Sequence, residues 1–198
     1  MELRGLRTSC EDLTPDVIAA HVDAGYHLVL VEDVMRHDLI AVNDAAVPPG
    51  LSLAPWEQAH IPNFYAAHCS AFAERPGFPN WPMAQWVSWT AGEQTFRPDL
   101  SYVALADDAG PIAFITCDDA SGEEDASAYI IQVGVHPKWR RMGIGRSLVT
   151  IALTAWRREG RAGVLCHVNV DNVASARMLE GTGFRKVRQR GVFERPAP

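Results

Sequence analysis

Residues 133 to 146 read VGVHPKWRRMGIGR, and this stretch decides the fold of the chain. Apolar residues alternate before it, Pro137 interrupts it and apolar residues at helical spacing follow it, so we predict a strand, a basic turn and a helix. The first N–H groups of a helix have no partner inside the helix, and the helix dipole adds partial positive charge there. The stretch therefore predicts a site for an anion such as a diphosphate at the start of this helix.

Glycines and arginines give the turn its chemistry. Gly143 and Gly145 have no side chain that would keep an anion away from the backbone. Arg140, Arg141 and Arg146 add positive charge around the same place. A glycine pair before a helix is weak evidence by itself, because an ordinary tight turn between a strand and a helix needs the same residues.

Outward from this stretch, the chain reads as a mixed α/β protein, with elements indicated by apolar periodicity and by the positions of glycine and proline. We predict strands at 51–54, 101–106, 112–117, 127–136 and 164–168, and a final pair of strands from residue 184. We predict helices at 57–72, around 83–90, and at 143–158 and 172–180. Unbroken alternation in the strand 127–136 would place Tyr129, Ile131, Val133 and Val135 on one face.

The first fifty residues are distinct from the rest. We predict an N-terminal helix and strand extension at 1–50 and a main domain at 51–198. The extension contains a small repeat, because GYHLV at 25–29 and VM at 34–35 match GFRKV at 183–187 and VF at 192–193 without a gap. Two interpretations stay open: the extension is the remnant of a second copy of the main domain, or two helix–glycine–strand units resemble each other by chance.

Composition excludes several classes of protein. A chain of 198 residues with 47% hydrophobic and 21% charged residues is typical of a globular protein. The formal net charge of -6 argues against non-specific binding to nucleic acid or membranes. The four cysteines are too far apart for a metal site or a redox motif, so we predict free thiols and no metal. No apolar run reaches the length of a membrane span and the first residues lack the layout of a signal peptide, so we expect a cytoplasmic protein.

Two motifs carry a family resemblance. The order Arg140-x-x-Gly143-x-Gly145, directly after a strand that ends in Val-His-Pro, resembles the acyl-coenzyme A signature of the GNAT superfamily of N-acetyltransferases. The stretch from Asn172 to Phe184 resembles the second conserved region of that family, at the usual distance from the first. The resemblance covers about residues 51–195.

Other segments are similar to one branch of the family. Pro76 to Pro79 and Arg97 to Ser101 are similar to the catalytic half of the mycothiol synthases, which are tandem GNAT enzymes. If the likeness holds, the extension at 1–50 would be what is left of a first GNAT repeat.

The resemblance implies a fold and a reaction. Family members have a mixed, mostly antiparallel sheet flanked by helices, and its two middle strands, here 127–136 and 164–168, splay apart. An acyl-coenzyme A, expected to be acetyl-CoA, would bind there and transfer its acyl group directly to an amine of a small molecule or a peptide, within a ternary complex and without metal. We expect no nucleic acid or membrane partner and leave a homodimer open.

The resemblance also assigns residues to the cofactor site. They come from the first strand, from the turn and from the second motif: Val133, Gly134, Val135, Arg140, Arg141, Met142, Gly143, Ile144, Gly145, Arg146, Asn172 and Ser175. Asn172 would serve equally as a helix N-cap. The N–H group of Val135 is the expected donor to the oxyanion that develops during transfer.

Two common catalytic groups of the family do not occur here. Leu179 stands where many members have a tyrosine that acts as general acid, and Tyr129 stands where several have a glutamate. Tyr129 would either relay a proton through water or simply pack, and His167 is either a base or a buried core histidine. Three functions therefore stay open: a small-molecule or peptide N-acetyltransferase, a protein N-terminal acetyltransferase, and a non-catalytic acyl-CoA-binding module.

Overall fold

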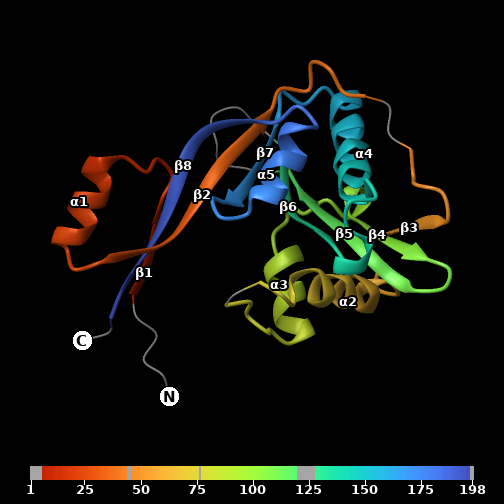
Figure 1. Ribbon diagram of the computed structural model, residues 1–198, viewed down its shortest axis with the longest axis horizontal. Coiled ribbons are helices and arrows are strands. Elements are labelled where there is room, and N and C mark those ends of the chain that lie inside the picture. The colour runs from red at the N-terminus through yellow and green to blue at the C-terminus, as the bar shows by residue number, and fades with distance from the viewer. Residues whose placement is uncertain (1–5, 44–45, 76, 120–127, 197–198) are drawn as a thin grey trace. The chain divides into compact units, whose positions relative to one another are not determined.

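The computed structural model describes residues 6–43, 46–75, 77–119 and 128–196 (Figure 1). Pro76 and Ser127, which fall in segments named above, lie outside these ranges. The chain divides into two compact units, one formed by Met1–Arg36 with Cys166–Pro198 and one formed by His37–Leu165. Each unit has its own strands and helices.

A mostly antiparallel sheet forms the centre of the second unit. Its strands follow the order β7-β6-β5-β4-β3, and they are β3 (Leu51–Pro55), β4 (Tyr102–Ala106), β5 (Gly110–Asp118), β6 (Ala128–Val135) and the first residues of β7 (Val164–Asn169). β4 and β5, which correspond to the strands predicted at 101–106 and 112–117, form an antiparallel hairpin. β6 and β7 are parallel, and their pairing joins Ala128 with Val164 and Tyr129 with Leu165.

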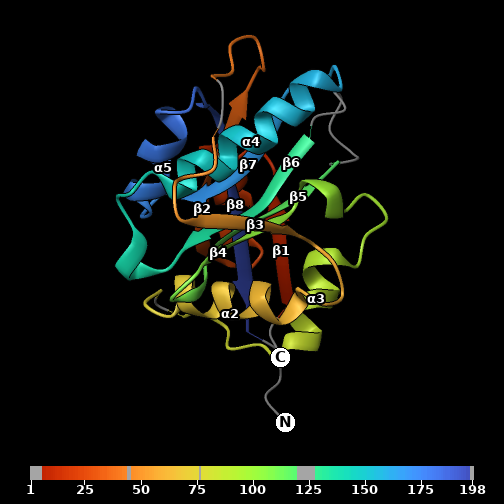
Figure 2. The same cartoon turned by 90° about the vertical axis from the view of Figure 1, so that its right-hand side faces the viewer.

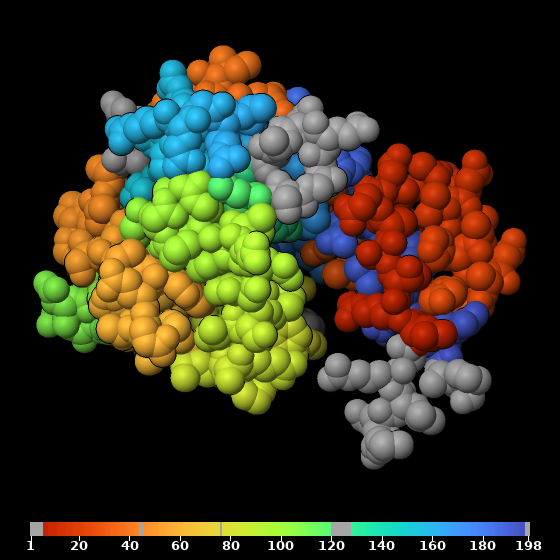
Figure 3. Space-filling model, turned by 180° about the vertical axis from the view of Figure 1, so that it is seen from behind, coloured from red at the N-terminus to blue at the C-terminus, as the bar shows by residue number. Residues whose placement is uncertain are grey.

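Helices cover both faces of this sheet (Figures 1 and 2). α2 (Ile61–Phe72) and α3 (Met83–Ala91) lie on one face, where Figure 3 shows them side by side, and α4 (Ile144–Arg158) lies on the other. Large apolar side chains fill the space between helices and sheet: Phe64, Trp86, Phe114, Leu148, Leu153 and Trp156. Short 3-10 helices, η1 (Pro98–Leu100) and η2 (Pro137–Trp139), precede β4 and α4.

α2 begins later than predicted. We expected the helix from residue 57, but it starts at Ile61, with Pro62 in its first turn. Residues 57 to 60 form a separate turn, in which the His60 N–H donates to the Glu57 carbonyl oxygen at 2.8 Å. Proline favours the first turn of a helix because its missing N–H has no partner there, and this fixes the start.

A β-bulge in β6 changes which residues share a face. The pairing with β5 skips Ile131, which is an extra residue in β6. One extra residue reverses the alternation of side chains beyond it. Tyr129 therefore lies on the opposite face of the sheet from Val133 and Val135, and the prediction that all of them share one face is wrong.

The first unit contains two helices and a second set of strands. These are β1 (Leu6–Cys10), α1 (Pro15–Asp23), β2 (His27–His37), the rest of β7, α5 (Val173–Glu180) and β8 (Arg185–Arg195), with the strand order β1-β8-β2-β7. β8 is antiparallel to both of its neighbours.

The predicted final pair of strands is wrong, because residues 185 to 195 form the single strand β8. Gly191 does not end this strand. A Cβ atom at Gly191 would lie 2.6 Å from Leu13 Cδ1 and 3.0 Å from Leu28 Cδ1, so the glycine lets both leucines pack against β8. The residue is required by close packing rather than by a turn.

The fold class is mixed α/β, with a mostly antiparallel sheet flanked by helices, as the sequence predicts. All four cysteines are free thiols, as predicted. Within the described ranges, every helix is too short or too polar to cross a bilayer.

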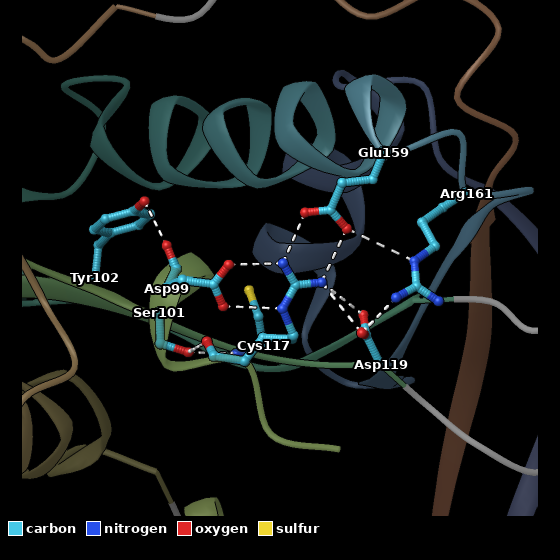
Figure 4. A network of polar contacts seen from close by, with 8 residues as sticks. Asp99, Ser101, Tyr102, Cys117, Asp119, Glu159 and Arg161 are labelled. Atoms are coloured by element: carbon cyan, nitrogen blue, oxygen red, sulfur yellow. Dashed lines mark hydrogen bonds and ion pairs between the residues drawn. The ribbon is translucent and has the colours of Figure 1, made fainter. Parts of the chain in front are cut away.

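A network of charged side chains in the second unit connects η1 to the end of α4 (Figure 4). The Arg97 guanidinium donates to both carboxylate oxygens of Asp99, at 2.9 and 2.7 Å, and to both of Glu159, at 3.0 and 2.7 Å. It also donates to Asp119 at 3.1 Å. These hydrogen bonds lower the pKa of the Asp99 and Glu159 carboxyl groups. Only 16% of the Arg97 side chain is exposed, so the network is partly shielded from solvent.

Replacement of Arg97 by methionine should destabilise the protein by about 2 kcal/mol at pH 7, because the three carboxylates lose their shared counter-charge. The folded pKa values of Asp99 and Glu159 lie below their unfolded values, so this stabilisation is present at neutral pH and is lost as pH falls through the folded values. Urea unfolding at pH 7 and near pH 4 should show a smaller difference from wild type at the lower pH. Arg158→Met, which removes an exposed arginine of α4, is the control; equal effects of the two substitutions at pH 7 would contradict the role of Arg97.

Candidate functional site

The turn between β6 and α4 has an unusual backbone. Arg141 and Gly143 both have positive φ angles, of 69° and 79°, and Gly143 is the N-cap of α4. A positive φ at an arginine costs roughly 1 kcal/mol, and such strain is typical of functional sites. Backbone in which residues with positive and negative φ angles alternate turns successive N–H groups toward one side of the chain and forms an anion-binding concavity.

The N–H groups of the turn are available for a ligand. Within the described part of this unit, none of the backbone N–H groups of residues 141 to 146 donates a hydrogen bond; the first helical donor is Ser147, which bonds to the Gly143 carbonyl oxygen at 2.9 Å. Arg141 and Arg146 are exposed beside them. Six N–H groups at a helix start, with two cations, match the electrostatic requirements of a diphosphate.

The glycines of the turn keep the approach open. A Cβ atom at Gly145 would meet Val135 Cγ2 at 3.4 Å, and a Cβ atom at Gly143 would meet nothing within 4 Å. Ile144, between them, is buried and anchors the helix start, whereas Met142 is 61% exposed. The backbone at 143 to 145 is thus anchored on its buried side by Ile144 and unobstructed on the side of Gly143.

Arg140, which we predicted to bind an anion, is instead bonded to other residues of the protein. Its guanidinium donates to the carbonyl oxygens of Val135 at 3.2 Å and Ala71 at 3.0 Å, and forms an ion pair with Glu74 at 3.0 Å. These contacts fasten the end of β6 to the end of α2. Arg141 and Arg146 are therefore the side chains of the turn whose charge is left for an anion.

β6 offers polar backbone groups along one edge. The His136 N–H donates to the Ile112 carbonyl oxygen of the β5 hairpin at 2.7 Å, so alternate residues Gly134 and Gln132 also turn their polar groups toward β5. Val133 and Val135 consequently turn theirs toward the other edge. Within the described residues of this unit, the Val135 carbonyl oxygen accepts from Arg140, while the Val135 N–H and both groups of Val133 have no partner.

Gly134 and Tyr129 belong to the face of the sheet that α2 and α3 cover. A Cβ atom at Gly134 would lie 2.7 Å from Phe114 Cε1 and 2.8 Å from Ala71 Cβ, so this glycine allows α2 to pack closely. Tyr129 shares its face with Gln132, whose Oε1 accepts from Trp86 Nε1 at 3.1 Å. A polar pair thus interrupts the aromatic core next to the predicted catalytic tyrosine.

The other predicted site residues belong to the first unit. Asn172 is the N-cap of α5, because its Oδ1 accepts from the Ser175 N–H at 3.2 Å. His167 Nδ1 lies 2.9 Å from Arg190 Nη1. Burial, followed by the charges of Arg190 and Arg188, lowers the pKa of His167 to about 4. The imidazole is therefore neutral at pH 7 and a poor proton acceptor.

The structure collects Tyr129, Val133 to Val135 and Arg140 to Arg146 in one unit, and His167, Asn172 and Ser175 in the other. Sequence reasoning missed the partners Glu74, Gln132 and Arg190, which come from distant parts of the chain. Among the described residues, His, Cys, Asp and Glu side chains form no group of three or more that would hold a metal ion.

Comparison with known proteins identifies the family of the chain. The Acetyltransferase (GNAT) family matches residues 57–184, which contain β6, the turn, His167 and the N-terminus of α5. A mycothiol acetyltransferase of Nocardiopsis dassonvillei is 27% identical over 209 aligned positions, which cover 91% of this chain and 62% of that protein. The N-alpha-acetyltransferase 30 of Saccharomyces cerevisiae is 30% identical over 97 positions, which cover 46% of this chain and 55% of that protein. The chain thus spans less than two thirds of either relative.

A solved structure supports the same fold. The crystal structure of a GCN5-related N-acetyltransferase from Sphaerobacter thermophilus superposes with a TM-score of 0.75 at 20% identity, and the match covers 96% of this chain and 59% of that one.

Gly145→Glu tests the anion site. The new side chain would place bulk and negative charge among the N–H groups of the turn, so affinity for coenzyme A should fall at least tenfold, or by about 1.4 kcal/mol or more. Titration calorimetry with coenzyme A measures the loss, and circular dichroism with thermal melting shows whether the protein remains folded. Arg158→Glu adds a glutamate at the far end of the same helix, roughly 20 Å away, and should bind normally. Equal affinity of wild type and Gly145→Glu would exclude the turn as the binding site.

Proposed function

The chain belongs to the GNAT acetyltransferase family, and on that basis we propose that it transfers the acetyl group of acetyl-CoA to the amine of a small molecule. The observation that carries the proposal is the row of N–H groups at residues 141 to 146, without hydrogen bonds inside the described part of their unit. Coenzyme A carries a diphosphate, which is the kind of anion that such a row binds. Arg141 and Arg146 would add charge-assisted hydrogen bonds.

The free edge of β6 suits the rest of the coenzyme. The pantetheine arm contains two amides, and the N–H and carbonyl groups of Val133 would pair with one of them as a neighbouring strand does, while the Val135 N–H is left for the thioester. The arm would then run from the turn along β6 and bring the thioester beside Val135. Asn172 and Ser175 stay proposed contacts of the same ligand.

In the proposed reaction, the amine nitrogen attacks the thioester carbonyl carbon and the carbon–sulfur bond breaks. The nitrogen loses a proton as the amide forms, and the sulfur leaves as a thiolate that takes up a proton. The Val135 N–H would donate to the carbonyl oxygen as negative charge develops on it. Stabilisation of this charge by a fixed donor is expected to contribute most to the rate. Both reactants must be held together, so positioning supplies the other large contribution.

The amine must be neutral when it attacks, so a proton acceptor is needed. With its pKa near 4, His167 is poorly suited to that role. We therefore propose that Tyr129 takes up the proton through a chain of water molecules, because it lies six residues along β6 from Val135, on the face of the sheet that it shares with Gln132. The acceptor would then approach from the side of α2 and α3.

The kind of acceptor is proposed from coverage. Four mycothiol acetyltransferases match 91%, 92%, 85% and 81% of the chain and another matches 33%, whereas the N-terminal acetyltransferase of yeast matches 46%. Similarity along nearly the whole chain favours a small-molecule amine over a peptide. We further propose that the protein works in the cytoplasm, and leave a homodimer open.

Assays of thiol release from acetyl-CoA test the function. The purified protein is incubated with acetyl-CoA and with separate panels of small amines, namely amino acids, amino sugars and polyamines, and of peptides with free N-termini. We expect release at least about tenfold above the amine-free rate with one or more small amines, and an acetylated product by mass spectrometry. Turnover with peptides alone would establish N-terminal acetylation instead. Coenzyme A binding without turnover on any amine would indicate a non-catalytic module.

Tyr129→Phe separates proton relay from packing. If the phenol passes the proton, kcat should fall about tenfold or more while the KM for acetyl-CoA stays unchanged, because proton transfer contributes about this much and the coenzyme contacts remain. Tyr26→Phe removes a phenol from the first unit and should leave kcat unchanged. Wild-type kcat in Tyr129→Phe would show that Tyr129 only packs.

A further inference from the structure

The two halves of the first unit repeat each other element by element. The starts of β1 and β7, of α1 and α5, and of β2 and β8 are each 158 positions apart: Leu6 and Val164, Pro15 and Val173, His27 and Arg185. β2 and β8 are both 11 residues long. The repeat seen in the sequence therefore extends over whole strand–helix–strand units, 6–37 and 164–195.

Local hydrogen bonds recur at the same spacing. Thr14 Oγ1 accepts from the Val17 N–H at 3.3 Å, and Asn172 Oδ1 accepts from the Ser175 N–H at 3.2 Å. After each helix comes a glycine with positive φ, Gly25 at 81° and Gly183 at 100°. In both repeated segments, the N–H of the residue after this glycine donates to the carbonyl oxygen five residues earlier: Tyr26 to His21, and Phe184 to Leu179.

The pairing of β2 with β8 has two-fold symmetry. His27 pairs with Glu194 and Arg36 pairs with Arg185, and each of these pairs is the image of the other under a shift of 158. The register also skips one residue in each strand, Val29 in β2 and Val187 in β8, and these are images too. Two helix–glycine–strand segments that resemble each other only by chance would not be expected to have matching registers and matching bulges, so these observations favour duplication.

The two-fold symmetry of the pairing is broken at its centre, where the two equivalent residues carry opposite charges. Glu32 pairs with its own image, Arg190, and two identical residues would stand here in a perfect repeat. Arg190 Nη1 lies 3.4 Å from Glu32 Oε2, and Arg190 Nη2 lies 3.3 Å from Glu11 Oε1. Arg190 and Glu32 are 19% and 18% exposed, so the central pair is largely buried. Opposite charges stabilise such a pair, whereas like charges would destabilise it.

Arg190 connects this centre to His167. The same Nη1 lies 2.9 Å from His167 Nδ1. A guanidinium only donates hydrogen bonds, so Nδ1 is the acceptor and the proton of the neutral ring is on Nε2. Within the described residues of this unit, the charged groups known to act on the imidazole are Arg190 and Arg188 from β8; Arg190 is paired with Glu32 of β2, and both arginines are paired with Glu11, which follows β1.

We propose that residues 6–37 are a second copy of the unit 164–195, and that this copy now works as a positioning element: Glu11 and Glu32 hold Arg190, which holds His167 as a neutral imidazole with its proton on Nε2. Burial favours the neutral ring, and the nearby charges of Arg190 and Arg188 further disfavour a charged imidazole. His167 then serves as a hydrogen-bond donor and not as a base. That last consequence rests on the proposed function; the duplication and the tautomer do not.

NMR of the full chain labelled with 15N-histidine tests the proposal without any assay of turnover. Long-range 1H–15N spectra distinguish a protonated from an unprotonated ring nitrogen, and His167→Gln assigns the signals. Wild type should show Nδ1 unprotonated, Nε2 protonated and no titration between pH 7.5 and 5.5. In Arg190→Met the pKa of His167 should rise from about 4 toward 6.5 and the tautomer should become mixed. Arg190→Lys keeps a donor and should retain the wild-type tautomer.

The role of the N-terminal copy is tested by Glu11→Gln with Glu32→Gln, together and singly. The double variant should lose the single tautomer of His167, and each single variant should show a smaller change. Glu194→Gln removes a carboxylate of β8 that pairs with Arg7, and should leave the His167 signals unchanged. An unaltered tautomer in the double variant, or an Nδ1-protonated ring in wild type, would overturn the proposal. Absence of acetyl transfer would count against the proposed function but would leave these signals as expected.

Discussion

The candidate site depends on a helix whose first N–H groups have no partner among the described residues of their unit. A helix start normally finds side-chain or backbone acceptors, since unpaired polar groups cost free energy when they are shielded from water. Here the positive φ angles at Arg141 and Gly143 turn those groups outward, and Arg140 fastens the preceding strand to α2. The helix itself is held by a buried face that includes Leu148 and Trp156. A rigid frame would therefore present the proposed coenzyme with a preformed set of donors, which would lower the entropic cost of binding.

The bulge in β6 divides that strand into two parts with different tasks. Beyond Ile131, Val133 and Val135 turn their side chains toward α4 and their polar backbone groups to the free edge. Before it, Tyr129 faces the side of α2 and α3. A regular strand would place all three side chains on one face, so one inserted residue separates the surface proposed for the coenzyme from the surface proposed for the acceptor. Bulges commonly redirect side chains next to active sites in this way.

Local signals in the sequence were sufficient for the elements around the turn. Pro137, the glycines and the apolar spacing of α4 fix that region because each acts within a few residues, and the N-cap role of Asn172 is of the same kind. The bulge was not predictable, since nothing in the residues around Ile131 differs from a regular strand. The partners of Arg140 and His167 were not predictable either, because Glu74 and Arg190 come from distant parts of the chain. The repeat of 25–35 at 183–193 was visible, but only the register of β2 with β8 shows how far it extends.

The first unit is built from the two ends of the described chain, and this has a consequence for its folding during synthesis. β1 and β2 both pair with β8, so Leu6 cannot pair until Arg195 has been synthesised, and Glu32 cannot pair until Arg190 has been synthesised. Because pairing between strands so far apart in the chain closes a long loop, it is slow and comes late. On the ribosome, β1, α1 and β2 emerge long before β8, and their strand edges need protection from other nascent chains until residues 185 to 195 have left the exit tunnel.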